Sequence, residues 1–184
     1  MKKQMVLAVL TKDRPGVIAD ITGAIFRLEG DLADLKQSVL WGYLTMILIV
    51  NFPAAVTKDE LAAAIAANEN TADFQVSVKE LAVPLTSDLP MPADSFVMTV
   101  QAANRGGLVY QVSRFCYERG INILDLTTTL RDGRYTMALQ LDLSKVASLA
   151  VLREELAAFA EKNGLSLTLQ HNDLFQVTQD VRLY

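Results

Sequence analysis

Two short loops carry residue types that suit the binding of a small charged solute. The first loop contains Asp13, Arg14, Pro15, Gly16 and Val17, and the second contains Asn104, Arg105, Gly106, Gly107 and Leu108. Both combine a side chain with acceptor oxygen atoms, an arginine, and a glycine that lets a ligand or a neighbouring backbone approach closely. Where such a loop opens a helix, the unpaired amides of the first turn can dock a small carboxylate. A capped helix start without a ligand would use the same residues.

An apolar run before the first loop and a periodic apolar pattern after it define the elements that hold this loop. Residues 5–10 are all apolar, which predicts a buried strand. Apolar residues then recur at helical spacing, at Val17, Ile21, Ala24, Ile25 and Leu28. At this junction we expect Asp13 to accept hydrogen bonds from the first helical turn and Pro15 to occupy an early helical position.

The chain repeats itself at a constant offset of 91 residues. Adding 91 to Arg14 gives Arg105, and the same shift relates Gly16 to Gly107. Without a gap, this register also aligns Asp34-Leu35 with Asp125-Leu126, Gly42 with Gly133, Thr45-Met46 with Thr136-Met137, and Ala66-Ala67 with Ala157-Ala158. Chance does not produce so long a gapless register, so the sequence predicts two copies of one domain.

Each copy is predicted to have the element order βαββαβ. In the first copy the predicted segments are a strand near 4–10, a helix near 15–28, strands at 32–40 and 43–51, a helix capped by Thr57, and a strand at 74–78. Trp41-Gly42 and Arg131-Asp132-Gly133-Arg134 are expected hairpin turns. Both faces of 43–51 carry bulky apolar groups, which suggests a strand covered on both sides.

The fold class expected is α+β, with two tandem domains of antiparallel sheet and helix. We expect the first domain at 1–82, a proline-containing linker at 83–94, the second domain at 95–172 and a C-terminal extension at 173–184. Even spacing of apolar residues in the extension suggests an added edge strand or a partner contact.

Composition excludes several classes of function. A formal net charge of -4, a pI near 5.0 and the lack of any run of Lys or Arg argue against direct nucleic-acid binding. Cys116 lies on the apolar face of a predicted helix, so we expect a buried thiol. His171 is interpreted as a surface group, and one cysteine with one histidine cannot assemble the usual zinc patterns. No metal and no cofactor is implied.

Two apolar runs are too short to be targeting or membrane segments. The run after Lys2-Lys3-Gln4 is too short for the hydrophobic region of a signal peptide, and Leu44 to Val50 is too short for a membrane span. We therefore expect a soluble, cytoplasmic protein without a membrane partner.

The repeated loops and the order βαββαβ resemble tandem ACT domains, and more particularly the glycine cleavage system transcriptional repressor family. The resemblance covers nearly the whole chain apart from the linker and the extension. It implies a ferredoxin-like fold with helices on one face of each sheet, and small ligands, typically amino acids, bound where neighbouring units meet. Carried over by position, the ligand contacts are the residues of the two loops, namely Asp13, Arg14, Gly16, Val17, Asn104, Arg105, Gly106, Gly107 and Leu108, with Asp31 and Asn122 opening the second strands.

Of the two copies, the second has the better chemistry for a free amino acid. Such a ligand needs acceptors for its ammonium group and donors for its carboxylate; Asn104 and Asn122 supply both, whereas ionised Asp13 and Asp31 only accept. We predict glycine, serine or another small amino acid as the ligand. Gly106 departs from the proline of the family pattern and loosens this loop.

Two other classes of function remain open at this stage. An acyl-phosphate hydrolase would use Arg105 with Asn122 to bind phosphate, and a structural dimerisation module would bind no ligand. We favour a non-catalytic regulatory protein, expected to be a homodimer, that senses an amino acid and acts on a protein partner such as a transcriptional regulator. In such a protein the ligand shifts the populations of domain arrangements.

Overall fold

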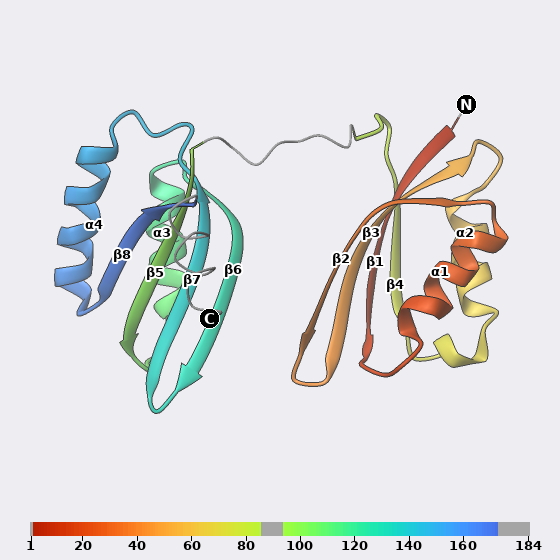
Figure 1. The fold of residues 1–184 in the computed structure, drawn as a ribbon, viewed down its shortest axis with the longest axis horizontal. Helices are drawn as coiled ribbons and strands as arrows, with labels where there is room; N and C mark the ends of the chain where they lie inside the picture. The colour runs from red at the N-terminus through yellow and green to blue at the C-terminus, as the bar shows by residue number, and fades with distance from the viewer. Residues whose placement is uncertain (1, 86–93, 173–184) are drawn as a thin grey trace, which may run out of the picture. The chain divides into compact units, whose positions relative to one another are not determined.

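The computed structural model describes residues 2–85 and 94–172, which belong to two compact units (Figure 1). Unit 1 is Met1–Leu89 and unit 2 is Pro90–Tyr184. Most of the predicted linker and all of the predicted C-terminal extension lie outside the described residues. Among the described helices, none is both long enough and apolar enough to cross a membrane.

Unit 1 is one antiparallel sheet with its helices on a single face. Its elements are β1 (Lys2–Lys12), α1 (Val17–Arg27), β2 (Asp31–Leu40), β3 (Tyr43–Pro53), α2 (Lys58–Ala66), the short 3-10 helix η1 (Glu69–Thr71) and β4 (Gln75–Glu80). The strand order is β2-β3-β1-β4, so the first and third strands of the chain lie at the centre of the sheet. The helix α1 contacts β2, and α2 contacts β4.

Unit 2 repeats this plan. Its elements are β5 (Ser95–Ala103), α3 (Leu108–Glu118), β6 (Asn122–Arg131), β7 (Arg134–Asp142), α4 (Leu149–Asn163) and β8 (Ser166–His171). The strand order β6-β7-β5-β8 matches that of unit 1. The predicted pair of ferredoxin-like βαββαβ units is confirmed.

The duplication extends to backbone details at the 91-residue offset. Gly16 and Gly107 precede their helices with positive φ values of 94° and 83°. In both sheets the pairing shifts by one residue early in the edge strand, between Leu32 and Asp34 and between Ile123 and Asp125. Both hairpins turn through two residues of positive φ, as the tight turn between twisted strands requires: Trp41 and Gly42, and Asp132 and Gly133.

Each unit has its own hydrophobic core between sheet and helices. In unit 1 the inward side chains of β1 and β3 meet those of α1 and α2, and Leu7, Leu48, Ile21 and Leu61 are fully buried. The prediction that 43–51 is covered on both sides is wrong. Burial alternates along β3, and Tyr43 and Ile47 are half exposed, because the helices cover one face of the sheet only.

The helix caps follow local chemistry, with one correction. Thr57 begins α2 through a capping box with Glu60, as predicted: its hydroxyl accepts from the Glu60 amide, and the Glu60 carboxylate accepts from the Thr57 amide. The expected roles of Asp13 and Pro15 are wrong. Gly16 is the N-cap of α1, no side chain caps this helix, and Pro15 lies outside the helix. The left-handed conformation of Gly16 turns the chain into the helix instead.

The glycine after α1 is required by packing. A Cβ at Gly30 would lie 2.5 Å from Phe52 Cε1 and 2.7 Å from Ile25 Cγ2, and both of these side chains are buried. We expect Gly30→Ala to destabilise unit 1 by about 1–3 kcal/mol through overpacking. In contrast, Gly23→Ala places a Cβ no closer than 3.7 Å to Arg27 inside α1, and we expect it to stabilise unit 1 by about 0.5–1 kcal/mol. Denaturant unfolding of both variants checks the pair, and equal effects would contradict this packing.

Candidate functional site

Both loops predicted from the sequence lie between the first strand and the first helix of their unit. The Asp13 amide donates to the Gly42 carbonyl at 2.9 Å, and the Asn104 amide donates to the Gly133 carbonyl at 2.9 Å. Each loop is thereby held beside the hairpin of its own sheet. No side chain caps α1 or α3, so the amides of both first helical turns remain available to a carboxylate.

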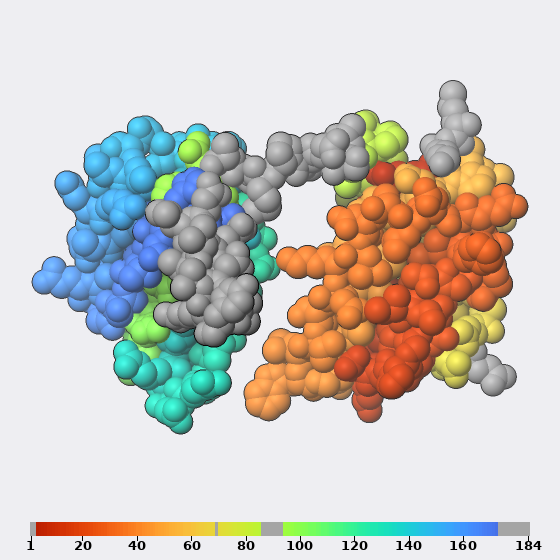
Figure 2. Space-filling view, in the orientation of Figure 1, coloured from red at the N-terminus to blue at the C-terminus, as the bar shows by residue number. Residues whose placement is uncertain are grey.

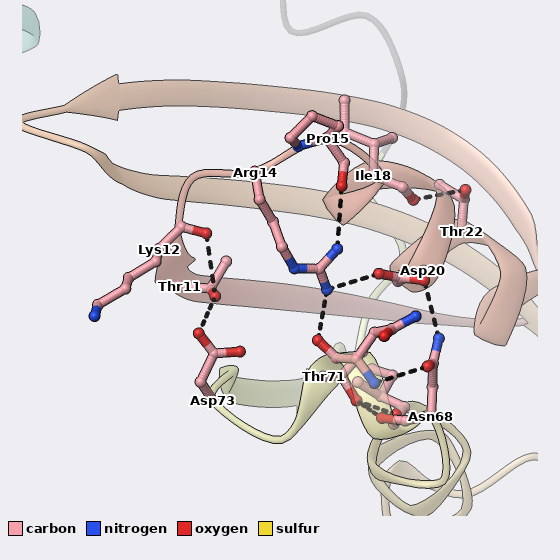
Figure 3. A network of polar contacts seen from close by, with 12 residues as sticks. Thr11, Lys12, Arg14, Pro15, Ile18, Asp20, Thr22, Asn68, Thr71 and Asp73 are labelled. Atoms are coloured by element: carbon pink, nitrogen blue, oxygen red, sulfur yellow. Dashed lines mark hydrogen bonds and ion pairs between the residues drawn. The ribbon is translucent and has the colours of Figure 1, made fainter.

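In unit 1 the arginine of the loop is engaged by the unit itself (Figure 3). The Arg14 guanidinium donates to the Asp20 carboxylate at 2.8 Å and to the Asn70 carbonyl at 2.5 Å, and it lies 5.4 Å from the centre of the Phe74 ring. The Asn68 amide donates to the same carboxylate at 3.0 Å. Arg14 therefore ties the loop to η1 and is not free to clamp a ligand.

This network gives a pH-dependent prediction. The Arg14 guanidinium, with help from Asn68, holds the pKa of the Asp20 carboxyl below its usual range. Because the folded-state pKa is lowered, the carboxylate stabilises unit 1 above the usual aspartate pKa, and this stabilisation is lost as the pH falls through the lowered value. We expect Asp20→Asn to lower stability at pH 7 and to flatten its pH dependence below about pH 4. Unfolding at pH 7 and pH 3 tests this, with the exposed Asp59→Asn as control; matching pH profiles for the two variants would refute it.

In unit 2 the same loop is held less tightly. Arg105 is exposed and makes a hydrogen bond of 2.9 Å to the Asn163 carbonyl. Gln111 and Phe159 stand where unit 1 has Asp20 and Asn68, so the ion pair and its supporting amide are replaced. The glycines of the loop are open, since a Cβ added at Gly106 or Gly107 would meet nothing within 4 Å.

A groove lies against the first loop. It has a volume of about 780 Å³ and is lined by the loop residues Asp13 to Val17, by Ile18, Ala19 and Thr22 of α1, by Gln37 of β2 and by Leu44 of β3. The groove thus runs from the loop toward the edge of the sheet. Sequence reasoning missed Gln37 and Thr22, because neither belongs to a motif and the groove forms only when β2 and α1 lie side by side.

The residues that open the second strands lie far from the loops of their own unit. Asp31 pairs with Asn51, which pairs with Gln4 near the start of β1, whereas Asp13 follows the end of β1. The difference of nine positions along β1 (13 − 4) corresponds to about 30 Å of strand. In unit 2 the register puts Asn122 beside Asp142 and Ser95, at the opposite end of the sheet from Asn104.

This register decides what one unit can do alone. The loop residues and the residue that opens the second strand cannot touch one solute within a single unit. The phosphate-binding pair considered for an acyl-phosphate hydrolase, Arg105 with Asn122, is therefore not brought together within unit 2. Among the described residues, no three His, Cys, Asp or Glu side chains gather in a way that could hold a metal ion.

Comparison with known proteins identifies the family of the chain. A family profile described as ACT domain matches residues 3–79. A UPF0237 protein of Clostridium perfringens is 34% identical over 80 residues, which cover 43% of this chain and 90% of that protein. The chain belongs to the ACT domain family. A UPF0237 protein of Neisseria meningitidis is 36% identical over 83 residues, which cover 44% of this chain and 90% of that protein.

Solved structures extend the fold comparison to both ACT units. A protein of Galdieria sulphuraria aligns over 93% of this chain and 99% of its own, with a TM-score of 0.72 and 19% identity. A protein assigned as a glycine cleavage system transcriptional repressor aligns over 92% of this chain and 97% of its own, with a TM-score of 0.72 and 15% identity. At these identities the likeness shows that the tandem fold is shared.

Each ACT unit exposes apolar side chains along the border between its first helix and its edge strand; the helix positions match at the 91-residue offset, whereas the strand positions differ by one residue. In unit 1 this border comprises Ile18 and Phe26 of α1 and Leu32 of β2, with Phe26 81% exposed. Figure 2 shows the α1 and β2 residues, red-orange and orange, side by side on the visible surface of unit 1. In unit 2 the border comprises Val109 and Tyr117 of α3 and Leu124 of β6, with Tyr117 82% exposed. Exposed aromatic side chains beside an edge strand mark a surface for association.

The cysteine and the histidine of the second ACT unit are explained by packing. Cys116 is buried in the core, as predicted, and His171 ends β8 with its ring edge-on to Phe96 at 5.0 Å. Burial raises the pKa of the Cys116 thiol to about 11. We expect no labelling of the native protein by a thiol reagent at pH 8, and labelling at the rate of unfolding once denaturant is added. Rapid stoichiometric labelling of the native protein would contradict this burial.

Proposed function

We propose that this protein is a non-catalytic regulator that binds a small amino acid between two ACT units and passes the signal to a protein partner. The observation that carries the proposal is the register of the sheets. It puts the two groups of predicted ligand contacts at opposite ends of each unit. A ligand can touch both groups only when a second unit lies edge to edge with the first and the two edge strands are antiparallel. The start of the second unit's edge strand then lies beside the loop of the first unit.

In the proposed arrangement unit 2 pairs with unit 2 of a second copy. Asn104 of one copy then faces Asn122 of the other, and the twofold symmetry gives two equivalent sites. The carboxylate of the ligand meets the uncapped amides of α3 after Gly107, and the carboxamide oxygen of Asn122 accepts from the ammonium group. Small ligands such as glycine or serine suit a site of this kind, where the backbones of two units lie close together.

The apolar border supports edge-to-edge association of the copies. Val109, Tyr117 and Leu124 would pack against their counterparts and remove exposed apolar surface from water. In unit 1, the Asp34 carboxylate accepts from the Leu35 amide at 2.8 Å, which occupies one donor of the edge strand. At the edge of unit 1, packing of side chains, more than a continuous ladder of hydrogen bonds, would therefore hold such a contact.

The groove on unit 1 makes its loop a second candidate for the ligand. It reaches Gln37 on the edge strand, where the start of an antiparallel partner strand would close it. Two carboxylates, Asp13 and Asp31, would face one ligand there, and Arg14 is already engaged. This chemistry favours an ammonium-bearing solute without a free carboxylate, so we assign the amino-acid site to unit 2.

Regulation would follow from differential binding. A ligand that bridges two units favours the arrangement in which they are joined, and a partner that reads this arrangement responds to the ligand. The fold is shared with a protein assigned as a glycine cleavage system transcriptional repressor, which suggests a role in the transcription of genes for amino-acid metabolism. The acidic composition argues that such a role runs through a protein partner, in the cytoplasm, and not through direct contact with DNA.

A calorimetric screen of the common amino acids tests the proposal. We expect saturable binding of glycine or serine by the full chain, with one site per chain and no turnover of the ligand. Size-exclusion chromatography with light scattering, run with and without the ligand, should show a dimer that the ligand strengthens. Absence of binding by every amino acid in the screen would overturn the proposal.

A further inference from the structure

The helical face of unit 2 has a groove whose lining residues differ from those at the equivalent positions of unit 1. In unit 1, α1 and α2 contact each other, and they carry the small residues Gly23, Ala24 and Ala64. The equivalent positions of unit 2 are Arg114, Phe115 and Glu155, and α3 and α4 stand further apart there. The space between them has a volume of about 500 Å³, within the range of roughly 300–1,000 Å³ that is usual for small-molecule sites.

The floor of this groove is aromatic, with its two rings tilted by 39° to one another. The Phe115 and Phe159 rings lie with their centres 4.7 Å apart, and the Arg119 guanidinium lies 3.6 Å from the centre of the Phe115 ring. Both phenylalanines line the groove. Phe115 is buried beneath this guanidinium, so a planar aromatic group can stack on the Phe159 ring and on the guanidinium plane.

Of the charged side chains that line the groove, Lys162 has no ion-pair partner among the residues that the structure describes. The Arg114 guanidinium donates to Glu118 at 2.8 Å and to the Tyr110 hydroxyl at 3.0 Å, and Arg119 donates to Glu155 at 2.5 Å. Lys162 also lines the groove, is exposed, and makes no ion pair with any described residue. Its ammonium group can therefore pair with one anionic substituent of a ligand.

The groove also contains a polar atom that the fold leaves unsatisfied. The side-chain oxygen Oε1 of Gln111 is shielded from solvent and has no hydrogen-bond partner among the described residues. At the equivalent position of unit 1, the Asp20 carboxylate accepts from Arg14 and Asn68. A buried acceptor without a donor destabilises the protein, and a ligand N–H that meets Gln111 when its carboxamide turns toward the groove would relieve this cost.

We propose that the α3–α4 groove of unit 2 is a separate binding site for a planar heteroaromatic anion that carries an N–H donor. The ring lies on Phe159 and on the Arg119 guanidinium, the donor meets Gln111, and the anionic group pairs with Lys162. The site is independent of the amino-acid site at the loop of the same unit, because it uses the outer helical face and needs no second copy. The anion can be a carboxylate or a phosphate, since either pairs with an ammonium group.

Two probes separate these anion sources in a titration of the full chain by calorimetry. Indole-3-acetate has the ring, the N–H and a carboxylate but no ammonium group, and adenosine monophosphate has a phosphate. We expect saturable binding of at least one probe, unchanged by saturating glycine and by Asn104→Ala. If only the nucleotide binds, the anion is a phosphate; if only the indole binds, it is a carboxylate. If neither binds at millimolar concentration, the proposal is wrong.

Matched variants show whether the probe that binds does so in the α3–α4 groove. We expect Phe159→Asn, which introduces the residue of unit 1, to weaken binding at least tenfold, and Lys162→Gln to weaken it about fivefold, whereas Lys58→Gln on unit 1 has no effect. For an indole that binds, the wild type should prefer indole-3-acetate over its N-methyl analogue about fivefold, and Gln111→Leu should abolish that preference while raising the melting temperature of the empty protein. Binding insensitive to both Phe159→Asn and Lys162→Gln would overturn the assignment.

Discussion

Replacing Leu139 by alanine is expected to lower the free energy of unfolding of unit 2 by about 3–5 kcal/mol. Leu139 is fully buried at the centre of β7, where it packs between the sheet and both helices of its unit. The rigid strand and its neighbours cannot collapse into the cavity, so the loss of packing adds to the lost transfer free energy. Most of the stability of a single domain would be removed.

Leu48, at the same position of unit 1, provides the matched experiment. Leu48→Ala is expected to destabilise unit 1 by a similar amount, because Leu48 is also fully buried on the third strand of its unit. Hydrogen exchange resolved by peptide should show each substitution lowering protection in its own unit. Thr45→Ala, on the exposed face of β3, is the control. Equal loss of protection in both units from either leucine substitution would contradict the two separate cores.

Loss of either asparagine is expected to weaken amino-acid binding by about 10- to 100-fold. Each would remove a hydrogen bond to a charged group of the ligand, which contributes about 1.5–3 kcal/mol. Because Asn104 and Asn122 are exposed and lie outside the core, their replacement by alanine should leave folding unchanged. The effect on affinity can therefore be separated from an effect on stability.

Calorimetry of Asn104→Ala, Asn122→Ala and the double variant measures this loss. The exposed Gln170→Ala, on the edge strand β8, serves as the control and should bind as the wild type does. Matching substitutions in unit 1, Asp13→Ala and Asp31→Ala, should change the affinity for glycine or serine little. Wild-type affinity in the double variant would remove the assignment of the site to unit 2.

Much of the fold could be predicted because the sequence contains the same pattern of residues twice. A backbone position with positive φ strongly favours glycine. Gly16 and Gly107, and Gly42 and Gly133, therefore recur at the 91-residue offset. The helical spacing of Val17, Ile21, Ala24 and Ile25 marks the side chains that the structure buries. Cys116 could be predicted as a buried thiol from its place on such an apolar face.

The predictions that failed depended on contacts between elements. Nothing in the loop indicates that Arg14 donates to the Asn70 carbonyl, because that contact forms only when η1 is folded beside α1. Asp13 looked like a helix cap because aspartate often fills that role, but the left-handed Gly16 takes the position. The strand 43–51 carries apolar residues on both faces, although its unit covers only one of them.

The site residues show the same limit. Asn104 and Asn122 could be chosen from the sequence as complementary to an amino acid, but their separation follows from strand register, which places them at opposite ends of the sheet. The groove between α3 and α4 could not be predicted either, since its width depends on how Phe115 and Phe159 pack.

A mixing experiment tests most directly whether two copies share each site. Asn104→Ala chains and Asn122→Ala chains are unfolded together, refolded as a mixture, and titrated with the amino acid found in the screen. If each site takes Asn104 from one copy and Asn122 from the other, half of the dimers are mixed and each has one intact site, so about a quarter of the wild-type high-affinity sites should return. If the mixture binds no better than the two variants measured separately, the ligand does not lie between copies of unit 2.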